Sequence, residues 1–200
     1  RGANKPLRHA LAHLVDAKGL IDTVDAGRNT PARSLVPDGL YADSQATGAK
    51  ARAYDVAEAK RLLAAAGHAD GKGLPPLTVL FGATNERTRT LFDFLRLRFA
   101  AAGVVLKPEY LDYPSYVKQA DAGKFHLAWS SWYADYPDPE SSLAYLQSKN
   151  IGGGWNHAGF NNAAFDRAHA AARVAADGPE RLALFKQLNE LIFEEVPLVP

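Results

Sequence analysis

The chain has 200 residues, of which 47% are apolar and 22% are charged, and its formal net charge is +1. These values are typical of a globular protein with enough apolar material for one large domain or two small ones, and a charge near zero argues against a nucleic-acid-binding surface. No apolar run reaches the roughly 18–20 residues that cross a bilayer, and the lack of cysteine excludes disulfides, thiolate metal sites and a cysteine nucleophile.

Two short helices and a long loop are predicted at the start of the chain. Asn4 or Lys5 caps a first helix with apolar residues at helical spacing, and Asp16 caps a second helix over residues 17–24. Residues 28–53 lack periodicity, so we expect a long loop over the surface. Loops of this length are usually functional or mobile.

The pattern that follows predicts two successive βαβ units, preceded by a helix over 55–66. Strands and helices alternate strictly, as strand 77–81, helix 85–102, strand 104–110, helix 112–122 and strand 125–132. Parallel strands joined by crossover helices form a sheet with helices on its faces. The sequence therefore predicts an α/β fold with a mostly parallel sheet.

The third predicted strand leads into the most distinctive stretch of the sequence. Residues 125–132 are nearly continuous in apolar and aromatic side chains, which favours a strand covered on both faces at the centre of the sheet. The turn Asp135-Tyr-Pro-Asp-Pro139 follows, and each of its prolines removes a backbone donor and fixes φ. Because open α/β sheets bind ligands beyond the carboxyl ends of their strands, this acidic, aromatic turn is the candidate ligand site.

Each residue of this stretch also has a structural explanation. Trp129 is better explained as part of the core, and Asp138 as the N-cap of a helix that begins at Pro139. For Trp132 and Asp135 we favour contact with a ligand, because a carboxylate beside aromatic rings suits a cationic group joined to an apolar one.

The last third of the chain is predicted to be mainly helical. A helix is expected over 140–147, a flexible break over 151–154, and two long helices from 161 to 176 and from 177 onward. The apolar residues 196–199 suggest the start of a further strand.

No set of residues indicates catalysis or a metal centre. His9 and His13 are spaced as paired ligands on one helical face, but the glutamate of a helical zinc motif is absent and no third ligand is suggested. Neither a Gly-x-Ser-x-Gly motif nor a phosphate-binding glycine loop is present. Asp135 and Asp138 could serve as the acid and base of a hydrolase, although nothing positions a scissile bond. We therefore predict no cofactor, no metal and no enzymatic activity.

Several stretches, in order along the chain, carry a family resemblance. They are Asn4-Lys-Pro-Leu-Arg-His-Ala-Leu11, Gly71-Lys-Gly-Leu-Pro-Pro-Leu-Thr78, Trp132-Tyr-Ala-Asp-Tyr-Pro-Asp-Pro139, Phe160-Asn-Asn-Ala-Ala-Phe-Asp166 and Glu194-Glu-Val-Pro-Leu-Val-Pro200. Together they resemble the peptide/nickel class of extracellular solute-binding proteins of ABC transporters, which includes the dipeptide- and oligopeptide-binding proteins. The resemblance covers almost the whole chain.

The resemblance implies that residues 1–200 form a single domain, most of the second, C-terminal lobe of a two-lobe periplasmic-binding-protein-like receptor. It implies a periplasmic or lipid-anchored protein, a monomer when intact, that captures peptides and delivers them to ABC permease subunits. Family members are much longer, and this chain starts at Arg1 without a signal peptide. We therefore expect a processed chain or an excised piece that lacks the first lobe.

The resemblance also implies a ligand contact. In peptide-binding members the aspartate of a Trp-x-Ala-Asp-Tyr stretch pairs with the α-ammonium group of the ligand, and this position matches Asp135. The predicted ligand-binding residues are Asp135, Trp132, Tyr133, Tyr136 and Trp129. Other members carry nickel chelates, haem or other small solutes, so the solute class stays open. Besides the hydrolase, a further alternative is an interaction domain that uses an exposed half-cleft lined by Trp132, Tyr133 and Tyr136.

Overall fold

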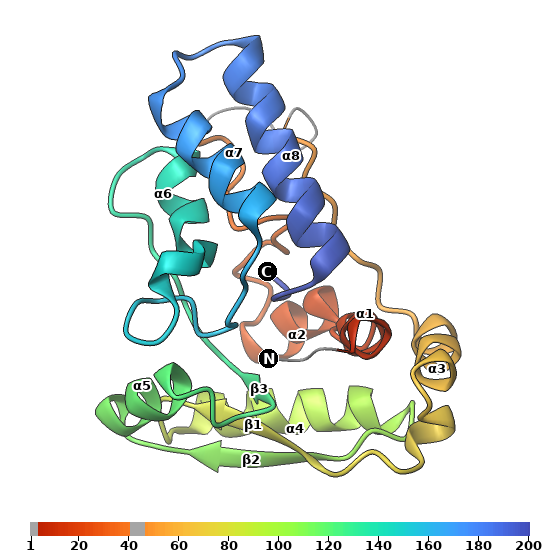
Figure 1. The fold of residues 1–200 in the computed structure, drawn as a ribbon. Coiled ribbons are helices and arrows are strands. Elements are labelled where there is room, and N and C mark those ends of the chain that lie inside the picture. Colours follow the sequence, from red (N-terminus) through yellow and green to blue (C-terminus); the bar gives the residue numbers. More distant parts are fainter. Residues whose placement is uncertain (1–3, 41–46) are drawn as a thin grey trace.

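A three-stranded parallel sheet with helices on both faces forms one half of the molecule (Figure 1). The structure is a computed structural model and describes residues 4–40 and 47–200. The sheet has the order β2-β1-β3, and α4 and α5 connect its strands along the chain. The elements are β1 (Leu77–Phe81), α4 (Glu86–Ala100), β2 (Leu106–Tyr110), α5 (Tyr113–Asp121) and β3 (Leu127–Ala128). The predicted α/β fold class and the two βαβ units are confirmed.

The predicted central strand over 125–132 is wrong in length and in place. Only Leu127–Ala128 pairs with β1, and the Trp129 amide adds one hydrogen bond of 2.9 Å to the Leu80 carbonyl. β1 is the central strand instead, because both other strands pair with it and its residues are mostly buried. Trp129 packs on the α4 side of the sheet and Ala128 on the α5 side, as alternate strand residues do. Trp132 instead packs against the C-terminal helices, so the run leaves the sheet before its end.

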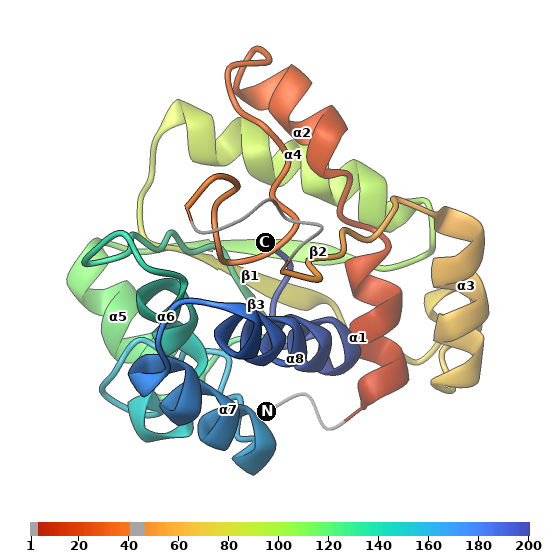
Figure 2. The ribbon, with the colours of Figure 1, turned by 90° about the horizontal axis from the view of Figure 1, so that it is seen from above.

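Alternate residues of β1 reach the two faces of the sheet. Val79 and Phe81 are buried in the core that includes α4, whereas Leu80 is buried against Tyr116 and Ala120 of α5. Figure 2 shows the strands between these two helices. Opposite Val79, the outer strand β2 carries Pro108.

The N-terminal helices complete the core on the α4 side. They are α1 (Lys5–Ala12), α2 (Ala17–Val24) and α3 (Val56–Ala65), followed by the 3₁₀ turn η1 (Ala69–Gly71). Asn4, Asp16 and Asp55 cap them through their side chains, as the sequence predicts for the first two. The described parts of the predicted loop, residues 28–40 and 47–53, contain no helix or strand; residues 41–46 of that prediction lie outside the described residues.

The second half of the molecule is helical and lies beyond the β3 edge of the sheet (Figure 1). It has its own buried core, which includes Phe165, Phe185 and Leu188. Its elements are α6 (Pro139–Leu143), η2 (Ala144–Leu146), η3 (Ser148–Asn150), α7 (Ala163–Val174) and α8 (Pro179–Glu195). No helix among the described residues combines the length and the hydropathy needed to span a bilayer.

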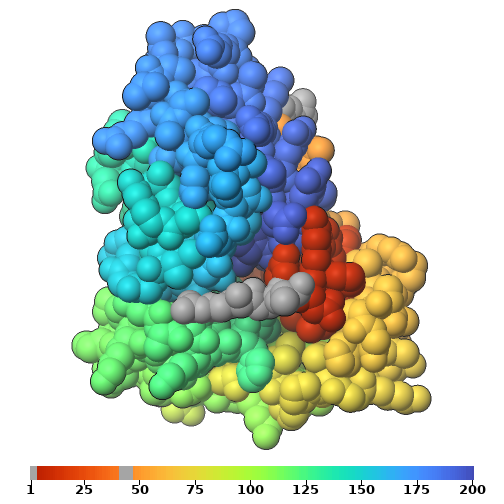
Figure 3. All heavy atoms as spheres, in the orientation of Figure 1, coloured from red at the N-terminus to blue at the C-terminus, as the bar shows by residue number. Residues whose placement is uncertain are grey.

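The predicted strand over 196–199 is also wrong. Val196 has φ 49° and ψ 58°, a left-handed conformation that ends α8 and turns the chain, and no described residue pairs with the segment as a strand. The end of α8 itself lies against α1, where Glu195 contacts Lys5 and Arg8. In the space-filling view, α1 (red) lies at the joint between the sheet (yellow to green) and the C-terminal helices (blue) (Figure 3).

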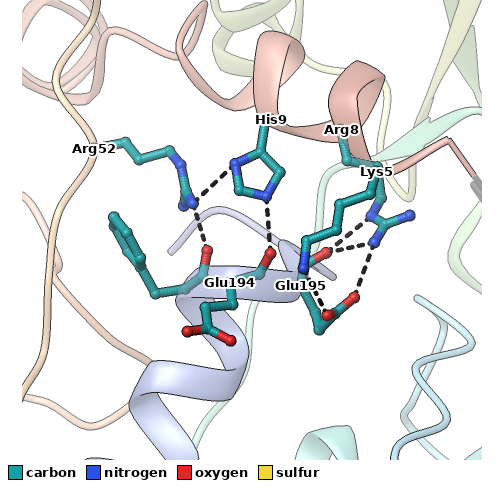
Figure 4. Close-up of polar contacts among 7 residues, drawn as sticks. Lys5, Arg8, His9, Arg52, Glu194 and Glu195 are labelled. Carbon is teal, nitrogen blue, oxygen red and sulfur yellow. Dashed lines mark hydrogen bonds and ion pairs between the residues drawn. The ribbon is translucent and has the colours of Figure 1, made fainter. Parts of the chain in front are cut away.

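Basic side chains from the N-terminal part of the chain cap the carboxyl end of α8 (Figure 4). Arg8 donates from Nε and Nη2 to the Glu195 carbonyl at 2.9 and 2.7 Å, and Lys5 pairs with the Glu195 carboxylate at 2.8 Å. His9 Nε2 lies 2.8 Å from the Glu194 carbonyl, and Arg52 donates to the Phe193 carbonyl. Positive charge at this end of a helix satisfies unpaired carbonyls and complements the helix dipole.

Candidate functional site

The turn between β3 and α6 carries most of the predicted ligand-binding residues to the surface. Asp135 is exposed, Tyr133 is 84% exposed and Tyr136 is 49% exposed. Trp132, in contrast, is half-buried and packs against the core of the C-terminal helices. The structure therefore exposes three of the five predicted residues on one turn, whereas Trp132 packs into the C-terminal core.

Asp135 presents its carboxylate without an ionic partner among the described residues. Its backbone amide, however, is fixed, because it donates a hydrogen bond of 3.0 Å to Ser141 Oγ. A held backbone with an uncompensated carboxylate at the surface is suited to binding a cationic group.

Tyr136 is held by the same short helix. Its hydroxyl donates to the Glu140 carboxylate. This hydrogen bond, and secondarily partial burial, raise the pKa of Tyr136 above its usual value. The phenol therefore stays neutral and presents its ring at the surface.

Asp138 has a structural role, as the sequence predicts. Its Oδ1 accepts from the Glu140 amide at 2.8 Å, which makes it the N-cap of α6, and Arg181 Nη2 lies 2.8 Å from its Oδ2. Because both oxygens of Asp138 are engaged, it is poorly placed to serve as the acid or base of a hydrolase with Asp135.

Trp132 begins a row of aromatic rings that crosses from the C-terminal helices to α5. Its ring centroid lies 5.2 Å from Tyr145 and 5.9 Å from Trp155. From Trp155 the row continues through His157, Tyr116 and Tyr113, at successive centroid distances of 6.2, 6.1 and 6.1 Å. Trp155 is 48% exposed and Tyr113 56% exposed, so the row is open to solvent at both places.

A hydrogen bond attaches Tyr116 of this row to the backbone just after β3. The Tyr116 hydroxyl donates to the Trp129 carbonyl at 3.0 Å. Burial raises the pKa of both Tyr116 and Tyr145, although a hydrogen bond with Ser130 lowers each pKa somewhat.

Sequence reasoning missed Trp155 and Tyr113 as exposed members of the aromatic row that begins at Trp132. They come from a glycine-rich segment and from the start of α5, which are distant in sequence from residues 132–138. The only local signal was an isolated tryptophan directly after three glycines.

Two other predicted features lie elsewhere. Trp129 packs against the core on the α4 side, as the structural explanation expects, and its assignment as a ligand-binding residue stays a prediction. His9 Nε2 and His13 Nδ1 contact the carbonyls of Glu194 and Ala53, at 2.8 and 3.0 Å. Within the described residues no three His, Asp or Glu side chains gather as metal ligands.

Comparison with known proteins places the chain in a family. Residues 2–154 match the family model of the bacterial extracellular solute-binding proteins, family 5 Middle. The chain is 29% identical to heme-binding protein A of Haemophilus influenzae, over 98% of this chain and 36% of that protein. It is 26% identical to di/tripeptide-binding protein 3 of Pseudomonas aeruginosa, over 97% of this chain and 36% of that protein.

A solved structure has the same fold. The ABC transporter-associated periplasmic binding protein DppA from Helicobacter pylori, in complex with the peptide STSA, matches with a TM-score of 0.84 at 26% identity, over 98% of this chain and 38% of that one. This chain thus spans a little over a third of the length of the relatives it matches. The chain belongs to the family 5 bacterial extracellular solute-binding proteins.

Proposed function

We propose that the chain is most of the second lobe of the substrate-binding component of an ABC importer, which captures di- or oligopeptides between two lobes and delivers them to a membrane permease. The observation that carries this proposal is the exposed, ion-pair-free carboxylate of Asp135 on a turn whose backbone is fixed by Ser141. A relative named as a di/tripeptide-binding protein and a neighbour solved with a bound peptide support the peptide class.

In this proposal Asp135 pairs with the α-ammonium group of the peptide. The exposed ring of Tyr133, together with those of Tyr136 and Trp155, contacts side chains of varied shape, and Trp132 backs them from the core. Sequestering the pair between two lobes strengthens it, because charges attract more strongly away from water. The protein works outside the cytoplasmic membrane, periplasmic or lipid-anchored, as a monomer without turnover.

The first experiment compares Asp135→Ala with the wild type in the receptor chain that includes the facing lobe. Affinity for peptides with a free amino terminus is expected to fall by about 2–5 kcal/mol, the scale for removing one partner of a buried charge pair. Titration calorimetry measures the affinity, and Asp93→Ala on the exposed side of α4 is the matched control. An unchanged affinity in Asp135→Ala would refute the anchor.

A second candidate is the same receptor class with haem or a metal chelate as solute. One of the matching relatives, at 29% identity, is named as a heme-binding protein. Mass spectrometry of small molecules released on denaturing the purified receptor separates the two candidates. Recovered short peptides support the first, whereas haem or a nickel chelate overturns the peptide assignment and keeps the receptor class.

A further inference from the structure

We infer that Ser141 and the Arg181–Asp138 ion pair are positioning residues: they fix the turn that carries Asp135 and thereby set how strongly the site prefers a free α-ammonium group over a neutral amino terminus. The inference rests on the proposed function, in which Asp135 binds that group. None of the three side chains is itself required to touch the solute.

Ser141 connects the exposed turn to a buried helix. All five residues of α6 are buried, and Ser141 is 3% exposed. Its Oγ accepts the hydrogen bond from the Asp135 amide at 3.0 Å. Because the direction of a side chain follows from its backbone, holding this amide restricts where the Asp135 carboxylate can lie.

Arg181 fixes the other end of the turn from α8. It is 7% exposed and donates from Nε to the Ala172 carbonyl at 2.9 Å, from Nη1 to Asp177 at 2.8 Å and from Nη2 to Asp138 Oδ1 at 2.9 Å. A buried guanidinium engaged on three sides has little freedom, so Asp138 is held as well. The turn from Asp135 to Asp138 is therefore attached at both ends to buried groups.

A third attachment joins Tyr136, in the middle of the turn, to Glu140 of α6. Its carboxylate receives the Tyr136 hydroxyl, and its carbonyl lies 3.0 Å from Nε2 of the buried His169. A binding group that is already ordered avoids the entropy cost of being ordered by its ligand. The attachments should therefore benefit the contact made by Asp135 in particular, rather than all contacts with the solute equally.

A purely structural role predicts a different result. If these residues only stabilised the helices, their loss would weaken binding of every peptide to the same extent. The ratio of affinities for free and Nα-acetylated peptides is therefore the decisive quantity. It changes only if the position of the Asp135 carboxylate changes.

The test uses the receptor chain with its facing lobe and an equimolar mixture of random tripeptides, half of them Nα-acetylated. Equilibrium dialysis followed by mass spectrometry gives the ratio of free to acetylated peptide bound. Ser141→Ala is expected to lower this ratio about two- to tenfold, the range that the loss of one hydrogen bond produces. Asp138→Asn, which keeps the capping oxygen but loses the charge facing Arg181, should lower it in the same direction.

Ser142→Ala is the matched control, since Ser142 is the neighbouring buried serine of α6, whereas the Asp135 amide donates to Ser141. It is expected to leave the ratio unchanged. If Ser141→Ala and Asp138→Asn keep the wild-type ratio, or lower binding of both peptide forms equally, the positioning role is wrong while the anchor stands. If the wild type itself binds without preferring free amino termini, the proposed function fails and the inference with it.

Discussion

Individual contacts in this chain fall into two groups that differ in how far apart their partners are in the sequence. The N-caps at Asn4, Asp16 and Asp138 bind amides two or three residues away, and local sequence patterns predict all three. Arg181 lies 43 residues from Asp138, and no local pattern identifies it. The residues that the turn displays were therefore predictable, whereas the residues that hold the turn were not.

His9 makes the stability of the chain depend on pH. Burial lowers its pKa below the ordinary 6.5, and the neighbouring cations Arg52, Lys5 and Arg8 lower it further, while the hydrogen bond to the Glu194 carbonyl opposes them. Well above pH 6.5 the imidazole is neutral in both the folded and the unfolded chain. Below that pH the unfolded chain takes up a proton that the folded chain resists, so stability falls as the pH drops toward the lowered pKa.

We expect His9→Gln to lose part of this pH dependence. The slope of the unfolding free energy against pH, measured by urea denaturation from pH 7.5 to about 5, should be smaller in the variant than in the wild type. His68→Gln is the control for the loss of a histidine as such, because His68 lies outside the group formed by His9, Lys5, Arg8 and Arg52. Identical slopes in the wild type and His9→Gln would contradict the assignment.

At the scale of elements, ion pairs at both ends of α2 attach this helix to α4. Asp16, its N-cap, pairs with Arg98 at 2.9 Å, and Asp25, its C-cap, pairs with Arg87 at 2.8 Å. Burial alone would raise the pKa of Asp25, but hydrogen bonds from Arg87 and Asn29 outweigh it, and the pKa is lower than usual. This carboxylate therefore contributes stability above its unfolded pKa of about 3.8 and loses the contribution as the pH falls through its lower folded pKa.

Arg87→Met is expected to destabilise the chain by about 1–3 kcal/mol at neutral pH, because it leaves a buried carboxylate without its strongest partner. Urea denaturation measures the change. Arg96→Met is the matched control on the same helix, since the pair of Arg96 with Asp93 is exposed and 3.5 Å long. Such surface pairs contribute about 0–1 kcal/mol. If both variants lost the same free energy of unfolding, the burial of Asp25 would not be what determines the loss.

Sequence patterns predicted most helices and the first two strands, but not the place of the third. An apolar run is compatible with any buried environment, and in this chain its members divide among three clusters. Only the pairing partners decide which strand is central, and those lie about 50 residues apart (Val79 with Leu127). The same limit explains the unpredicted aromatic row from Trp132 to Tyr113.

At the scale of the whole molecule, the first and last helices are attached to each other. Loosening one of them is therefore expected to destabilise the other. Lys5 and Arg8 of α1 contact Glu195 at the end of α8, and His157 lies 3.3 Å from Asp121 of α5. The sheet half and the C-terminal helices are thus connected through α1 and through α5, in addition to the chain leaving β3.

Arg8→Met should weaken the first of these connections. We expect a loss of about 1–2 kcal/mol, since two hydrogen bonds from a charged group to the Glu195 carbonyl disappear. Hydrogen exchange should become faster at the last turn of α8 and in α1, with little change in the centre of α4. Lys18→Met, which removes an exposed pair with Asp22, is the control and should leave all three regions protected as in the wild type.

The outer strand of the sheet has one further consequence. The hydrogen bonds from Leu77 to the Val105 carbonyl and from Leu111 to the Phe81 carbonyl show that odd-numbered residues of β2 face β1. The backbone of Pro108 therefore faces outward, where its missing N–H costs the sheet nothing. Among the described residues no strand covers that edge, and a proline between the charged Lys107 and Glu109 leaves a neighbouring molecule a poor template for adding a strand. The β2 edge is thus protected against aggregation by strand addition, even at high protein concentration.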